Sequence, residues 1–118
     1  MKVNELKNEV YNLQKQLGYI KPDMTFEESI SYVRDLALAL TVEISEALNC
    51  LPWKLWKPVR EQNFWRTEFT KEVADIIVFA IDLMLVIAPD IDLEEVMSET
   101  LGKIEYRIKN QNYGKQGV

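Results

Sequence analysis

The chain has 118 residues, of which 47% are hydrophobic and 28% charged, and its net charge is −5 at pH 7. This length and balance predict one globular domain spanning residues 1–118, and the acidic charge argues against a nucleic-acid polymer as partner. The absence of histidine excludes Ser-His-Asp and Cys-His catalysis and favours oxygen-held Mg²⁺, with Mn²⁺ as the other option.

The first predicted element is an amphipathic helix over about residues 3–17. Leu6, Val10, Leu13 and Leu17 recur at the spacing of one helix face. We expect this helix to stop near Gly18. No apolar run follows the first residues, so the sequence predicts no signal peptide.

A second helix is expected to begin at Thr25, which has capping-box spacing with Glu28. It should end near Cys50. Its centre, residues 36–40, is apolar on every side, which is typical of a helix buried on several sides. In so short a chain this predicts a subunit interface, and hence a homodimer or a dimer of dimers. A single cysteine cannot form an internal disulfide, so we expect a reducing, cytoplasmic location.

Residues 51–58 contain two prolines and should form a loop or one short turn. A third helix is expected over about residues 63–87. Its apolar segment is interrupted by Asp75 and Asp82, so we expect no membrane span. Three aromatic residues near its start are interpreted as core: Phe64, Trp65 and Phe69.

Asp92 and Glu95 have the spacing that opens a fourth helix, expected to run to about Lys109. Residues 110–118 include two glycines and should form a tail or closing loop. Strand patterns are absent from the sequence. The predicted fold is therefore all-α, a four-helix bundle that assembles as an oligomer.

Two pairs of carboxylates mark the second and third helices: Glu43 with Glu46, and Glu72 with Asp75. An i, i+3 pair lies within about 60° of one helix face. Their neighbours are apolar, so these acids border a buried face, where unpaired carboxylates are costly and repel one another. Divalent cations between them would remove that cost. The alternative is that the acids are solvated or paired with lysines.

The spacing Glu43-x-x-Glu46, 25 residues, Glu72-x-x-Asp75 resembles the ExxE…ExxD signature of the all-α nucleoside-triphosphate pyrophosphatase superfamily. That superfamily includes dimeric dUTPases, MazG-like enzymes and a dCTP pyrophosphatase. The segment 52–57, Pro-Trp-Lys-Leu-Trp-Lys, is similar to a loop of the dimeric dUTPases. Gln14 resembles a family glutamine that contacts the base.

The run from Lys103 to Lys115 is similar to the phosphate-binding segment of the same family, with two departures. Arg107 stands where asparagine is usual, and Asn110 stands where arginine is usual. The resemblance implies Mg²⁺-dependent hydrolysis of a nucleoside triphosphate, namely dUTP to dUMP and pyrophosphate. Glu43, Glu46, Glu72 and Asp75 would then hold two or more Mg²⁺ ions, with Glu46 positioning the attacking water.

The residue types around the acids suggest substrate contacts. Tryptophan faces can stack on a base and lysines can reach a phosphate, although one tryptophan could simply plug the bundle end. Asp82 could accept a hydrogen bond from deoxyribose or base, or pair with a lysine. Lys103 and Arg107 share a helix face, which suits phosphate but also a solvated stripe. The residues expected at the substrate are Gln14, Trp53, Lys54, Trp56, Lys57, Asp82, Lys103, Arg107, Asn110, Tyr113 and Lys115.

Two alternatives remain open from the sequence. The same chemistry could act on dCTP or on non-canonical nucleotides, as in MazG-like house-cleaning enzymes. A non-catalytic helical dimerisation module, with acids that only solubilise it, belongs to a different class. A carboxylate-bridged di-iron protein normally needs Glu-x-x-His, which this chain cannot supply.

Overall fold

The computed structural model describes the backbone of residues 2–117 and the side chains of residues 2–111. In this part of the chain there is no strand, so the predicted all-α class is confirmed. The elements are α1 (Val3–Gln16), α2 (Phe26–Asn49), the 3₁₀ turn η1 (Val59–Glu61), α3 (Arg66–Ile87) and α4 (Leu93–Gly117).

The helix ends follow local signals in the sequence. The Thr25 hydroxyl accepts a hydrogen bond of 3.1 Å from the backbone N–H of Glu28 at the start of α2. At the start of α4, Asp92 Oδ1 accepts one of 3.3 Å from the N–H of Glu95. Gly18 follows α1 with φ of 81°, a left-handed conformation that favours glycine after a helix. All three predicted helix boundaries are confirmed.

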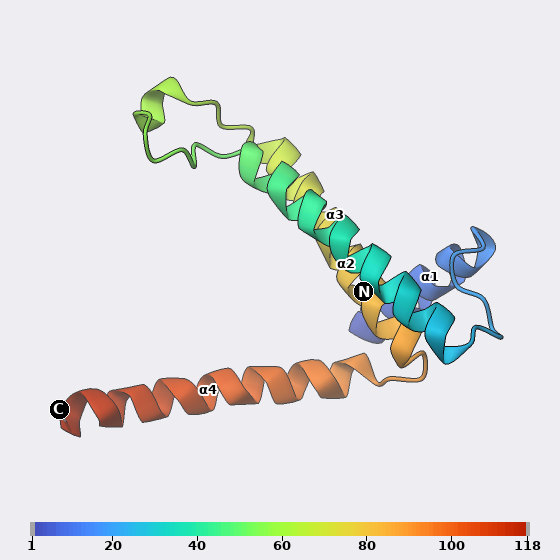
Figure 1. The fold of residues 1–118 in the computed structure, drawn as a ribbon. Coiled ribbons are helices and arrows are strands. Elements are labelled where there is room, and N and C mark those ends of the chain that lie inside the picture. Colours follow the sequence, from blue (N-terminus) through green and yellow to red (C-terminus); the bar gives the residue numbers. More distant parts are fainter. Residues whose placement is uncertain (1, 118) are drawn as a thin grey trace.

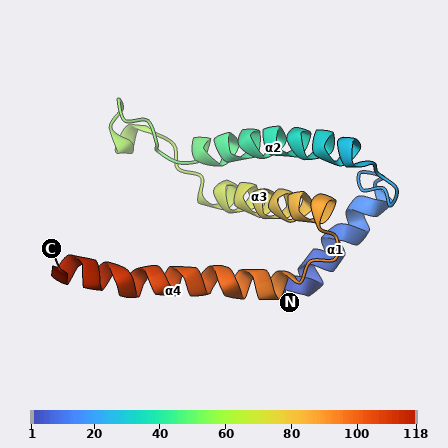
Figure 2. The same ribbon diagram turned by 60° about the horizontal axis from the view of Figure 1, so that its bottom comes forward.

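The four helices form two arms joined at a corner (Figures 1 and 2). One arm is the antiparallel pair α2 and α3, with the loop 50–65 at its far end. The other arm is α4, which packs against α1 and, apart from Leu93 in its first turn, does not pack against α2 or α3. Within one chain, therefore, the fourth helix does not close a bundle around the others.

A small core holds the corner together. Val10 of α1, Ile81 and Leu85 of α3, and Leu93 of α4 pack with Ile20 from the first connection. Leu85 and Leu93 are only 1% and 3% exposed. This cluster orients the two arms, because it contains residues from α1, α3 and the first turn of α4.

Two expectations about the chain were wrong. Phe64 and Trp65 are 60% and 52% exposed, because α3 begins only at Arg66 and both side chains precede it; Phe69 is half-buried. The segment 110–117 is not a loop but continues α4 to Gly117, since no proline interrupts it. Tyr113 and Lys115 have side chains outside the described part.

No helix within residues 2–117 combines the length and apolar character that crossing a bilayer requires. Asp75 and Asp82, on α3, interrupt the most apolar helix of the chain, as expected from the sequence.

Candidate metal and nucleotide site

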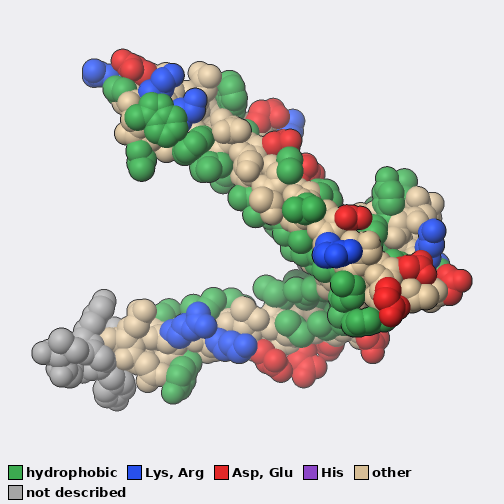
Figure 3. Space-filling view, viewed as in Figure 1, with side chains coloured by type: hydrophobic (Ala, Val, Ile, Leu, Met, Phe, Trp, Pro, Cys, Tyr) green, Lys and Arg blue, Asp and Glu red, His purple; other side chains and the backbone are tan. Residues whose placement is uncertain are grey.

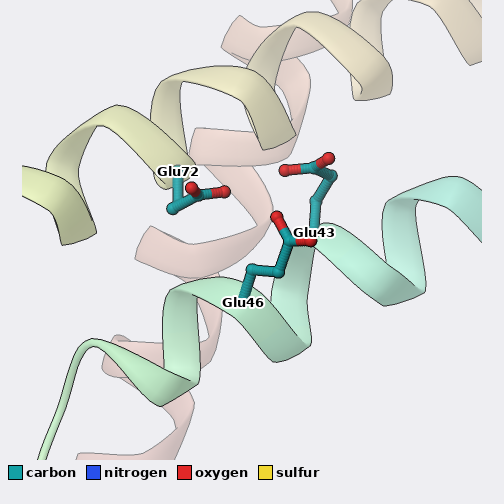
Figure 4. A group of neighbouring side chains, drawn as sticks. All are labelled: Glu43, Glu46 and Glu72. Carbon is teal, nitrogen blue, oxygen red and sulfur yellow. The ribbon is translucent and has the colours of Figure 1, made fainter.

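Three carboxylates meet where α2 and α3 run side by side. Each of Glu43, Glu46 and Glu72 offers a carboxylate oxygen, and these oxygens lie within 4.8 Å of one another. Figure 4 shows Glu43 and Glu46 projecting from α2, and Glu72 from α3, with their carboxylates near the space between the helices. The antiparallel pairing brings together acids that are 26 or more positions apart in the sequence.

The negative charge of this cluster has no cationic partner among the described side chains, where the one ion pair joins Lys71 to Glu68. Glu72 Oε2 is buried and accepts no hydrogen bond in the described structure. A hydrogen bond with Glu43, together with burial and repulsion from Glu43 and Asp75, raises the pKa of Glu72. A divalent cation would supply the missing partner, and an all-oxygen donor set suits Mg²⁺.

Asp75 lies one turn along α3 from Glu72, and its charge helps to raise the pKa of Glu72. Its side chain is exposed and is not in the group of three whose oxygens converge. The structure thus gathers three of the four predicted ligands, and a role for Asp75 at the metal stays a prediction.

A cavity of about 440 Å³ opens between α1, α2 and α3, beyond the carboxylates. At its wall, Gln14 Nε2 donates a hydrogen bond of 2.7 Å to Asp82 Oδ2. The other oxygens of this pair, Gln14 Oε1 and Asp82 Oδ1, are buried and have no partner among the described residues. Two orphaned acceptors beside a cavity suit a ligand that brings N–H or O–H donors.

Asp82 is only 1% exposed. This burial raises its pKa to about 6, against the opposing effect of the hydrogen bond from Gln14. Tyr32, across the cavity on α2, has its pKa raised by burial and by the charge of Asp82. The interpretation of Asp82 as a lysine partner is not supported, because its hydrogen bond comes from an amide.

Most residues of the cavity wall were not predicted from the sequence as substrate contacts, although the helical spacing of some of them was a signal. Tyr32, Leu36 and Ala39 all line the cavity, and they recur on α2 at the helical spacing that leads on to Glu43. The remaining wall residues come from the first connection, α2 and α3: Leu17, Tyr19, Asp35 and Phe79.

The cavity and the acidic cluster are neighbours on the same helix pair. Asp82 follows Glu72 by ten residues, which is about 15 Å along α3. Ala39 of the cavity wall precedes Glu43 by one turn of α2. A nucleoside in the cavity could therefore direct its phosphates toward the carboxylates.

The tryptophan and lysine loop lies on the other side of the carboxylates from this cavity. Trp53 and Trp56 pack edge to face, with ring centroids 5.6 Å apart. Gln62 holds the loop, because its Nε2 donates to the carbonyls of Lys54 and Lys57 at 2.8 and 3.0 Å. Within one chain no residue of this loop lines the cavity.

The remaining predicted contacts lie on α4. Lys103, Arg107 and Asn110 are exposed, and beyond Leu93 in its first turn α4 does not pack against the helices that carry the carboxylates. A single chain therefore does not bring these residues to the acidic cluster.

Comparison with known proteins identifies the family of this chain. The family model described as dUTPase matches residues 6–113, nearly the whole chain. Nothing matches among curated proteins or among solved structures. The matched range contains both acidic pairs, the loop and most of α4, so the resemblance drawn from the carboxylate spacing is confirmed. The chain belongs to the dUTPase family, and it is a dUTP diphosphatase-like enzyme with an all-α fold.

Proposed function

We propose that this protein hydrolyses dUTP to dUMP and pyrophosphate in a reaction that requires Mg²⁺. The observation that carries the proposal is the convergence of three carboxylate oxygens within 4.8 Å, without a cationic partner in the described chain, next to a nucleoside-sized cavity. Family membership supports dUTP or a related nucleotide as substrate.

Glu43, Glu46 and Glu72 would hold the metal, with Asp75 assisting from the next turn. Bound Mg²⁺ would neutralise charge on the triphosphate and make the attacking water more acidic. Mn²⁺ has similar ligand preferences and should substitute. Glu46 is the exposed member of the three, so we assign it the task of orienting the water and accepting its proton.

The cavity would bind the base and sugar. Gln14 and Asp82 offer the two buried oxygens that lack partners, and Tyr32 lies beside them. In a nucleoside, uracil keeps one ring N–H donor, N3–H, and deoxyribose has a hydroxyl, and either group could satisfy these oxygens. Lys54 and Lys57 would face the phosphate end, while Trp53 and Trp56 would shield that end from water.

The first test is pyrophosphate release from dUTP, dCTP, dTTP and dATP, measured with Mg²⁺ and again with excess EDTA. We expect hydrolysis of dUTP to exceed that of the other three and to stop when the metal is chelated. Faster turnover of dCTP or of a modified nucleotide than of dUTP would contradict dUTP as the substrate and support a house-cleaning activity instead. Absence of hydrolysis with every nucleotide would favour the non-catalytic dimerisation module.

We further propose that the protein is a homodimer or a dimer of dimers. Leu38 and Val42 on α2 are 68% and 54% exposed, although they lie in or beside the segment that is apolar on every side. Multi-angle light scattering at micromolar concentration should give at least twice the mass of 13.8 kDa. A stable monomer at that concentration would contradict this proposal.

A cytoplasmic location remains our expectation for this protein. Cys50 is buried, and burial together with the nearby carboxylates of Glu72 and Glu68 raises the pKa of its thiol. Such a thiol is poorly nucleophilic, which agrees with its interpretation as packing.

A further inference from the structure

The cavity between α1, α2 and α3 is lined as a site for a flat group without negative charge. Phe79 of α3, Tyr32 of α2 and Tyr19 of the first connection contribute aromatic rings to its wall, and an aromatic face can stack on a planar ring. Among the described residues that line it there is no Lys or Arg. Figure 3 shows Lys and Arg side chains at the far end of the α2–α3 arm, over the loop 50–65. The base of a nucleotide therefore suits this cavity better than its phosphates do.

Position along α3 brings the base, rather than the sugar, to Asp82. Asp82 follows Glu72 by ten residues, which is about 15 Å along the helix. In a nucleotide the sugar lies between the phosphates and the base, so the base extends furthest from a metal-bound triphosphate. If the three converging carboxylates hold the metal, the group that reaches Asp82 belongs to the base.

Asp82 has one free oxygen, and its neighbour Gln14 determines which one. Gln14 Nε2 donates a 2.7 Å hydrogen bond to Asp82 Oδ2, so Oδ2 is occupied. Oδ1 is buried and has no partner among the described residues. Burial raises the pKa of Asp82 to about 6, so at neutral pH the side chain is mainly a carboxylate, which accepts hydrogen bonds and donates none. This part of the wall therefore requires a hydrogen-bond donor on the base.

Uracil and cytosine differ at the ring nitrogen that can meet such an acceptor. N3 of uracil carries a hydrogen, whereas N3 of cytosine carries a lone pair. In the same pose, cytosine would turn this lone pair toward Asp82 Oδ1 and leave a buried acceptor unpaired, and sites built to bind an N–H group reject ligands that lack it. To offer its amino hydrogens instead, cytosine would have to shift along the cavity while its triphosphate stays at the metal.

We propose that Asp82 selects uracil over cytosine, with its Oδ1 accepting a hydrogen bond from N3–H of the base. Gln14 positions this carboxylate by occupying Oδ2, and Gln14 Oε1 remains available to a second donor of the same nucleoside. This inference rests on the proposed hydrolysis of dUTP. It adds which atom of the protein recognises the base and why a cytosine nucleotide is the poorer substrate.

The variant Asp82→Asn tests the proposal through selectivity rather than through activity alone. An amide can turn either its oxygen or its N–H group toward the base, so it can bind N3 of cytosine as well as N3–H of uracil. We expect the ratio of kcat/KM for dUTP to kcat/KM for dCTP to fall at least about tenfold, because the first value falls and the second rises. Asp90→Asn, at an exposed position beyond the end of α3, should keep the wild-type ratio. An unchanged ratio in Asp82→Asn would overturn the proposal.

Binding of nucleotides that resist hydrolysis gives a second measurement, made on the wild-type protein. The probes are dUTP and dCTP analogues with an imido group between the α and β phosphates, and the same dUTP analogue methylated at N3. In isothermal titration calorimetry with Mg²⁺, we expect the unmethylated uracil analogue to bind at least about tenfold more tightly than either of the other two. Equal affinities, or tighter binding of the cytosine analogue, would overturn the selection by Asp82.

The two measurements separate this inference from the proposed hydrolysis. If the uracil analogue binds preferentially but dUTP is not hydrolysed, the hydrolysis is refuted and the recognition by Asp82 stands. If dUTP is hydrolysed but Asp82→Asn keeps the wild-type ratio of dUTP to dCTP turnover, the hydrolysis stands and the recognition by Asp82 is refuted.

Discussion

Replacing Glu72 by Gln should lower kcat for dUTP at least about a hundredfold while raising the thermal stability of the metal-free protein. The activity falls because a cluster of three carboxylates loses a charge that would hold Mg²⁺. The stability rises because the neighbouring acids destabilise the charged form of Glu72, as its raised pKa indicates. Pyrophosphate release and differential scanning calorimetry, each with and without Mg²⁺, measure the two effects.

Glu68→Gln is the matched control for this variant. Glu68 lies one turn earlier on α3, is exposed and pairs with Lys71 at 3.7 Å, so its loss should change kcat little. Mg²⁺ should raise the Tm of this control as it does that of the wild type, but should not raise that of Glu72→Gln. If Glu72→Gln keeps both its activity and the Mg²⁺-dependent Tm shift, the carboxylate cluster is not a metal site.

Replacing Asp82 by Asn should make the protein more stable at neutral pH and poorer at binding dUTP. The pKa of Asp82 is raised to about 6 by burial, so the folded chain holds this proton more tightly than the unfolded chain does. The contribution of protonated Asp82 to the free energy of unfolding is therefore full below about pH 4, and it is lost as the pH rises through 6. The amide that replaces the carboxylate carries no charge, so the variant lacks this loss.

The measurement is Tm between pH 4 and 7.5 in the absence of metal. At pH 7.5 we expect a gain of about 4 °C for the variant, the shift that ~1 kcal/mol produces in a small domain. Asp35→Asn, at an exposed position on the same cavity wall, should leave the pH profile of Tm unchanged. A Tm that falls as much in Asp82→Asn as in the wild type between pH 4 and 7.5 would contradict the assignment to Asp82.

The same variant tests the ligand role of Asp82. If the buried Oδ1 accepts a hydrogen bond from the nucleoside, its replacement by an amide should raise KM for dUTP about tenfold, which corresponds to ~1.4 kcal/mol. An unchanged KM, together with the gain in stability, would assign Asp82 to structure rather than to substrate binding.

Local signals in the sequence determined the helices and the acidic cluster. The caps at Thr25 and Asp92 act over three residues, and the left-handed turn at Gly18 needs only its own backbone. Glu43 with Glu46 shares one helix face and Glu72 occupies another. Because both faces are bordered by apolar residues, pairing of the two helices was enough to bring these acids together.

Contacts between distant residues decided the rest. The hydrogen bond from Gln14 to Asp82 joins positions 68 apart, and no periodicity shows which glutamine and which aspartate will meet. The direction of α4 depends on Asn4, which bonds to residues 88 and 89 positions later. Spacing along the chain sets the orientation of a side chain on its own helix, but the relative placement of helices depends on tertiary packing at the corner. That is why the carboxylates could be predicted from the sequence, while the cavity and the separation of Lys103 and Arg107 from their own acidic cluster could not.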